Sequence, residues 1–418
     1  MTAASDTLDP SPARAVPLKR QLRRAERRKN LLFMALILPL AVFVLASFVL
    51  PIGSLLQRSI ANPEVHDNLP ETLELLDDWS GEGLPDEAAF VALARELGAA
   101  RGTPAIADIA KRLNREQPGL RSLVMRSARA LPLAEGTPAQ DGLIGIDERW
   151  RDPVIWETIK RAGSPTTGFY LLGAIDRTIA DGGEIVKLPK EEAIYLDVLV
   201  RTFEMSVIVT VACLLLGFPL AYLMATLPVR HANTLMILVL LPFWTSVLVR
   251  VAAWIVILQN EGLVNKLLMW LGATDAPIRL LFNRTGVYIA MVHILLPFMV
   301  LPLYSVMKGI SPVYMRAAVS LGCPPFSSFW KIYFPLTMPG IAAGSLLVFI
   351  VCMGFYITPA LLGGPGDQMI SYFIAFYTNQ AVNWGMAAAL SAVLLAATLV
   401  LYALYTRYLG GNAVNKIR

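Results

Sequence analysis

Long runs of apolar residues separated by polar segments dominate the sequence. Six runs are long enough to cross a bilayer as helices, because about 20 apolar residues span a hydrocarbon core roughly 30 Å thick. They lie at 31–50, 198–227, 235–258, 287–304, 341–362 and 384–405. The pattern therefore predicts an all-α, polytopic membrane protein with six transmembrane helices.

A polar segment at 54–195 separates the first apolar run from the other five. Within it, apolar residues recur at helical spacing, first at Phe90, Leu93 and Leu97 and then at Ile106 and Ile109. Further helices are expected at 120–131 and 153–162. The segment is thus predicted to be a large, mainly helical extracytoplasmic insert after the first transmembrane helix.

The distribution of charge separates this insert from the rest of the chain. The formal net charge of +5 combines a net of −7 at 54–195, where 16 Lys and Arg meet 23 Asp and Glu, with +12 elsewhere. A solvated acidic surface is the default interpretation of the insert, and a sharper hypothesis is that it attracts a cationic substrate or a binding protein. The basic residues elsewhere flank the membrane and show no interleaved aromatics, so no nucleic-acid partner is expected.

Charge bias also predicts the topology, because short cytoplasmic segments of membrane proteins are rich in Lys and Arg. Residues 1–30 carry eight such side chains, whereas the loop at 363–383 carries none. Both termini are therefore expected in the cytoplasm of a cell whose inner (plasma) membrane holds the protein. The predicted parts are, in order, a basic segment at 1–30, a first helix at 31–53, the insert, a core of five helices at 196–409 and a tail at 410–418.

Motifs for catalysis are missing from the sequence. The cysteines Cys213, Cys323 and Cys352 lie far apart, in or beside apolar runs, which argues against a disulfide framework and against zinc. The sequence contains no G-x-x-x-x-G-K-[S/T] loop for nucleotide phosphates. No nucleophile and base stand out as a pair. We therefore expect no enzyme activity, no metal and no cofactor on this chain.

The segment between the fourth and fifth apolar runs has an unusual pattern of small residues and prolines. Gly322 is expected to end a short helix that contains Ala317 and Ala318, because glycine tolerates the left-handed conformation at a helix C-terminus. A second short helix is expected after Pro324–Pro325, with Pro335 as its end. The pattern predicts two short helices joined by a bend at a membrane surface.

This segment resembles the coupling loop of ABC-transporter permeases, the E-A-A-x3-G-x9-I-x-L-P motif. The matching positions are Ala317, Ala318, Gly322, Ile332 and Pro335, whereas Arg316 replaces the family's Glu and Phe334 its Leu. The resemblance implies that residues 311–340 lie in the cytoplasm and dock in a groove of an ATPase subunit. The alternative is an ordinary connecting loop with a proline-rich turn.

Four further stretches are similar to the spermidine/putrescine branch of these permeases, at 214–222, 241–254, 261–265 and 355–365. The resemblance implies an importer in which two permeases sit on a dimer of cytoplasmic ABC ATPases and receive cargo from an extracytoplasmic substrate-binding protein. ATP would be hydrolysed by the partner and drive alternating access. Importers of opines, iron, thiamine or sulfate remain alternatives, as does a membrane scaffold or signalling anchor whose insert binds a ligand.

Polar residues inside apolar runs are costly, roughly 2.5–3.5 kcal/mol for a central charge, and are therefore functional candidates. Glu204 and Arg250 could face each other, either as a structural ion pair or along a substrate pathway. Glu204 and Asp367 are the better carboxylates for a cationic substrate. Aromatic side chains could add cation–π contacts, or act as packing and interfacial anchors. The candidate pathway residues are Glu204, Trp244, Arg250, Trp254, Tyr356 and Asp367.

Overall fold

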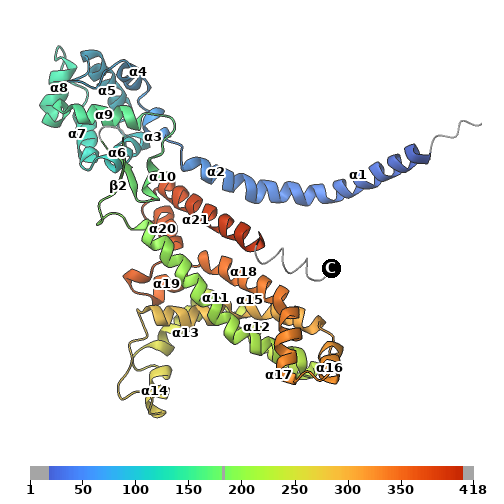
Figure 1. The fold of residues 1–418 in the computed structure, drawn as a ribbon. Helices are drawn as coiled ribbons and strands as arrows, with labels where there is room; N and C mark the ends of the chain where they lie inside the picture. The colour runs from blue at the N-terminus through green and yellow to red at the C-terminus, as the bar shows by residue number, and fades with distance from the viewer. Residues whose placement is uncertain (1–17, 181–183, 408–418) are drawn as a thin grey trace, which may run out of the picture. The chain divides into compact units, whose positions relative to one another are not determined.

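The computed structural model describes residues 18–180 and 184–407, which form two compact units divided between Gln57 and Arg58 (Figure 1). The predicted tail at 410–418 and the first 17 residues of the basic segment lie outside the described residues. Six helices are long and apolar enough to span a membrane within the described part. The predicted helical, polytopic fold class is thereby confirmed.

The first unit is one long helix. It runs through α1 (Leu18–Val44), a π-helical turn (Leu45–Val49) and α2 (Leu50–Arg58), whose last residue already belongs to the second unit. The candidate span is Phe33–Arg58, with a mean hydropathy of 2.7. The helix therefore extends beyond the predicted limits of 31–53 at both ends, and neither Pro51 nor Gly53 ends it.

The insert begins the second unit and is a cluster of short helices, as predicted. They are α3 (Pro63–His66), α4 (Pro70–Asp77), α5 (Glu87–Ala100), α6 (Pro104–Glu116), α7 (Leu120–Ala130), α8 (Ala139–Ile146), a 3-10 turn (Glu148–Arg151) and α9 (Pro153–Ala162). Proline opens four of these helices, where its missing N–H costs nothing because the first turn has no acceptor for it.

The core of the insert is built on two fully buried tryptophans. The ring of Trp156 lies 4.4 Å from that of Phe90 and 5.5 Å from that of Trp150. Each indole N–H also has a partner, since Trp150 donates to Ser127 Oγ at 2.8 Å and Trp156 donates to the Trp150 carbonyl at 3.0 Å. These contacts join α5, α7 and α9.

Replacing Trp156 by Ala is expected to destabilise the insert by about 3–5 kcal/mol, the usual cost of deleting a buried tryptophan. Hydrogen exchange on the full chain in nanodiscs should show lost protection in α5 and α9, with protection of α15 unchanged. The exposed Val91→Ala on the same helix α5 is the control and should leave protection as it is. Unchanged exchange in Trp156→Ala would contradict this account of the core.

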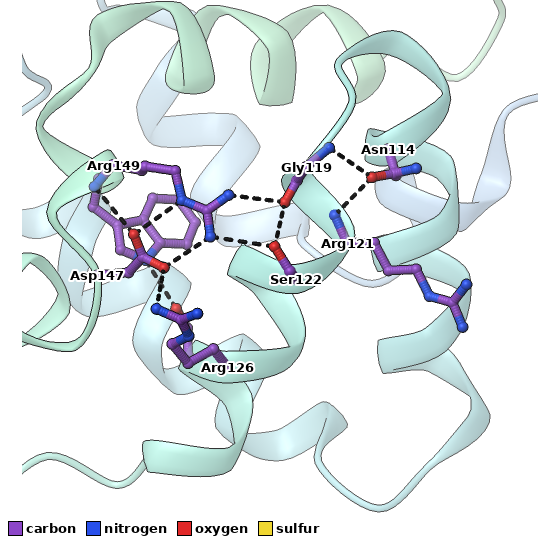
Figure 2. Close-up of polar contacts among 9 residues, drawn as sticks. Asn114, Gly119, Arg121, Ser122, Arg126, Asp147 and Arg149 are labelled. Carbon is purple, nitrogen blue, oxygen red and sulfur yellow. Dashed lines mark hydrogen bonds and ion pairs between the residues drawn. The ribbon is translucent and has the colours of Figure 1, made fainter.

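A polar network fastens the 3-10 turn to α7 (Figure 2). Arg149 donates to Asp147 Oδ2 at 2.8 Å, to the Gly119 carbonyl at 3.0 Å and to Ser122 Oγ at 3.3 Å, while Arg126 lies 3.1 Å from Asp147 Oδ2. Hydrogen bonds from Arg149 hold the pKa of the Asp147 carboxyl below its usual range. The network therefore holds the 3-10 turn on α7 at neutral pH.

Two elements connect the insert to the helices that follow. A two-stranded antiparallel sheet pairs β1 (Arg177–Ile179) with β2 (Ile185–Lys187), and α10 (Phe169–Gly173) precedes it. Tyr170 of α10 is buried in an apolar cluster with Met386 and Leu390 of α21 (Trp384–Tyr405). The insert is thus packed directly against the start of the last span.

The remaining helices surround a central trio. Its members are α11 (Tyr195–Thr226), α15 (Arg284–Gly309) and α18 (Phe334–Met353). Met299 of α15 fits between two glycines, since a Cβ at Gly217 or Gly344 would lie 3.0 Å or less from its side chain. Around the trio lie α12 (Val229–Leu240), α13 (Val247–Leu258), α14 (Leu263–Trp270), α19 (Ile357–Leu362), α20 (Ile370–Asn379) and α21.

Two of the later spans differ from their predictions by more than a few residues at an end. The run at 235–258 is not one helix, because the chain turns at Leu241–Trp244 and Ser246 caps a new helix by accepting from the Val249 N–H at 3.3 Å. The candidate span there is Val247–Trp270. The span predicted at 341–362 begins earlier, at Pro325 in the continuous helix, and ends at Met353, before a bend that leads into α19. The last span matches its prediction of 384–405.

Candidate coupling segment and charged pathway residues

The predicted pair of short helices is present between α15 and α18. It consists of α16 (Val313–Ser320) and α17 (Pro325–Ser328). Gly322 has φ +87°, and the bend around it is closed by two hydrogen bonds, from Cys323 N–H to the Ala318 carbonyl and from Gly322 N–H to the Val319 carbonyl, both 3.0 Å. This is a Schellman motif, in which a left-handed glycine satisfies the last carbonyls of a helix.

The expectation that Pro335 stops the second helix is wrong. The chain continues through a π-helical turn (Phe329–Tyr333) directly into α18. The wider turn places the Phe334 N–H on the Phe329 carbonyl, and Pro335 follows in the first turn of α18. A π-turn beside a proline removes the clash with the preceding turn of backbone. The coupling segment is therefore rigidly continuous with a membrane span.

Aromatic rings attach this segment to a second span. Phe329 lies 5.6 Å from Tyr222 of α11 and 6.3 Å from Phe218, in edge-to-face geometry with each. Tyr333 lies 5.3 Å from Tyr222 and 5.5 Å from Phe329. Such pairs contribute about 0.5–1.5 kcal/mol each beyond their buried area. The segment is therefore attached to α11 as well as to α18.

The outer face of the segment is apolar and exposed. Leu321 is 88% exposed, Phe326 78% and Trp330 50%. Exposed apolar side chains that gather on one element mark a surface that meets another protein or the membrane. Of the motif positions, the structure places Arg316, Ala317, Gly322 and Pro335 on the exposed side, Ile332 at half-burial and Ala318 in the interior.

The predicted contact between Glu204 and Arg250 is wrong. Glu204 instead lies 3.6 Å from Arg284, whose Nε donates to Asp367 Oδ1 at 3.0 Å. The three side chains come from α11, the start of α15 and the turn after α19. One cation thus faces two carboxylates, and the group keeps a net negative charge.

The other candidate residues lie apart from this triad. Arg250 and Trp254 are one turn apart on α13, and Trp254 Nε1–H donates to His293 Nδ1 at 3.2 Å. The Nε atom of Arg250 is buried and has no hydrogen-bond partner among the described residues. Trp244 is 78% exposed at the end of its turn, and Tyr356 is 40% exposed at the bend before α19.

Arg284 is the functional candidate that the sequence interpretation missed. It stands at the first position of α15, next to an Asn283 cap that accepts from the Thr285 N–H at 3.1 Å. A cation there could have attracted attention, because the positive-inside rule disfavours Lys and Arg at the predicted outer end of a span. Its partners lie about 80 residues away on either side, which sequence spacing does not reveal.

The chain belongs to the family of binding-protein-dependent transport system inner membrane components, whose model matches residues 205–409. Within that family it is similar to the spermidine/putrescine transport system permease PotB of Escherichia coli (strain K12), with 39% identity over 203 residues that cover 49% of this chain and 74% of the relative. The inner membrane ABC transporter permease YdcU of the same organism is 32% identical over 284 residues. These residues cover 61% of this chain and 86% of the relative. The predicted resemblance to this branch of ABC importer permeases is confirmed.

A bacterial alginate ABC transporter, solved in complex with an alginate-bound periplasmic protein, is similar to this chain with a TM-score of 0.41 and 19% identity. The match covers 51% of this chain and 77% of that one. The region matched by the family model contains the coupling segment and five of the six candidate spans in whole or in large part. The chain is thus a multi-pass permease subunit of the inner membrane.

Proposed function

We propose that this permease subunit imports polyamines, using ATP hydrolysed by a cytoplasmic partner. The observation that carries the coupling role is the exposed apolar tip of Leu321, Phe326 and Trp330 on a segment continuous with α18 and packed on α11. An ATPase groove that closes over this tip would move two spans together. Such a rigid link is what alternating access needs, because it converts one local movement into a rearrangement of packed helices.

The proposed assembly contains a dimer of ABC ATPases, a second permease subunit and an extracytoplasmic substrate-binding protein. Both termini and the segment 311–340 would lie in the cytoplasm, and the insert outside. ATP would be bound only by the partner ATPases.

The proposed cargo is supported by the similarity to spermidine/putrescine permeases and by the charge of the triad. Glu204 and Asp367 carry two negative charges against the single cation of Arg284. A site with residual negative charge attracts an ammonium group, and the insert contributes a further net of −7 to the field.

The test is uptake by the purified importer in proteoliposomes. We expect ATP-dependent accumulation of labelled spermidine or putrescine, and no effect of a tenfold excess of thiamine or ferric citrate. If thiamine or ferric citrate accumulates instead, the proposed cargo is wrong, but the proposed transport function stands. ATP-independent retention of ligand without accumulation would support the alternative of a membrane scaffold.

A further inference from the structure

A small basic recess lies where the insert meets the last span. It has a volume of about 250 Å³ and is lined from both sides of the junction. Four lining residues come from α6, its C-terminal turn and the start of α7, and two precede α21. They are Lys111, Asn114, Arg115, Arg121, Ala381 and Asn383.

The two amide side chains that line the recess have hydrogen-bond donors to offer a ligand. Asn114 Oδ1 accepts from the Gly119 N–H at 2.9 Å and from the Arg121 N–H at 3.2 Å, and its amide NH2 has no hydrogen bond to the residues that the structure describes (Figure 2). Asn383 Oδ1 likewise accepts from the Met386 N–H at 3.2 Å. Both amides are therefore oriented by the fold, since each carbonyl oxygen already accepts from a backbone N–H.

The three cations of the recess lack carboxylate partners. Within the described residues, Lys111, Arg115 and Arg121 form no ion pair, and Arg115 donates instead to the Tyr170 hydroxyl at 2.7 Å. Other arginines of the same helices are paired, since Arg112 lies 2.7 Å from Glu116 and Arg126 lies 3.1 Å from Asp147. The recess therefore concentrates uncompensated positive charge in an insert that is acidic as a whole.

The recess lies beside the end of a membrane span. Trp384 opens α21, is 44% exposed and stacks its ring 5.5 Å from the Arg58 guanidinium. Tryptophan is enriched at the headgroup level of membrane spans. Asn383 and Ala381 directly precede it, so the recess opens at the headgroup level on the insert side.

We propose that this recess binds the phosphate of an anionic phospholipid headgroup. Phosphate oxygens are acceptors only, which matches a lining of two amide donors, two guanidinium groups and one ammonium group. A free anion would share this chemistry, but the lipid phosphate is present at high local concentration at this depth. A bound headgroup would bridge α6 and α7 of the insert to the start of α21.

Native mass spectrometry of the detergent-purified importer tests the proposal, with phosphatidylglycerol as the probe. The triple variant K111Q/R115Q/R121Q should bind it roughly a hundredfold more weakly, because each basic residue contributes about 1 kcal/mol near an anionic surface. The control R95Q/R129Q/R151Q removes the same charge from other exposed positions of the insert and should bind as wild type does. Equal binding by both triples would overturn the proposal.

Two further measurements keep the test independent of folding and of ligand source. K111Q/R121Q leaves the Arg115–Tyr170 bond intact and should still weaken binding more than tenfold. Phosphatidylcholine, which has no net charge, should bind at least tenfold more weakly than phosphatidylglycerol. Binding of inorganic phosphate to the recess with no preference for the anionic lipid would contradict the lipid assignment.

Discussion

The double variant Leu321→Glu/Phe326→Glu is expected to abolish ATP-driven uptake while leaving the permease folded in the membrane. Both side chains are more than three-quarters exposed, so neither substitution removes a core contact. Two carboxylates placed in an apolar protein–protein contact without partners cost several kcal/mol. We expect association with the ATPase to weaken at least about a hundredfold, measured by co-purification and by uptake in proteoliposomes.

The matched control is Leu75→Glu, the same chemical change at an exposed position of α4 in the insert. It should leave both association and uptake at wild-type levels. Leu321→Met provides a second control, because it keeps an apolar side chain at the tip. Normal uptake by the double glutamate variant would refute the docking role proposed for this segment.

Local sequence signals predicted much of this fold, because helix ends are decided by neighbouring residues. Gly322 ends α16 in the left-handed conformation that its lack of a Cβ permits, and Pro104 and Pro153 begin α6 and α9. The last span at 384–405 matches its prediction, since its flanking residue Asn383 caps the helix. In each case the residue that signals a helix end lies within one helical turn of the end that the structure shows.

Predictions failed where the outcome depended on backbone geometry that hydrophobicity does not encode. Apolar residues continue across Leu241–Trp244, so the run reads as one span although the chain turns there. Pro335 is a helix breaker in isolation, but the preceding π-turn accommodates it. Hydropathy measures the tendency of a side chain to leave water. It therefore predicts neither the turn at Leu241–Trp244 nor the π-turn before Pro335.

Pairing between distant residues was the least predictable aspect of the site. Glu204 and Arg250 appeared to be partners because they were the conspicuous charges of neighbouring apolar runs. The structure pairs Glu204 with Arg284, which sequence interpretation treated as part of a loop. Which charges meet depends on how α11, α15 and the turn after α19 pack, and no local pattern specifies that.

Replacing Asp367 by Asn is expected to lower uptake at limiting polyamine concentration at least tenfold. Asp367 is the best-shielded carboxylate of the triad, with its side chain 14% exposed, and it holds two groups at once. One oxygen accepts from Arg284 Nε at 3.0 Å and the other from the Gly364 N–H at 3.0 Å. The neutral amide weakens both contacts, since charge-assisted hydrogen bonds are about twice as strong as neutral ones.

The variant would also leave Arg284 with Glu204, at 3.6 Å, as its one carboxylate in the triad, and would cancel the triad's net negative charge. Initial rates across a range of spermidine concentrations measure the effect. Asp275→Asn, at an exposed carboxylate of another loop, is the control and should transport normally. If the net negative charge of the triad serves the cargo, D367N/R284Q should recover much of the uptake, because Glu204 alone restores the net charge of −1. If the triad only holds α15 to the turn, the double variant should stay impaired, because the contact between residues 284 and 367 is still lost. If D367N itself transports spermidine with wild-type kinetics, the proposed role of Asp367 in the substrate pathway is wrong.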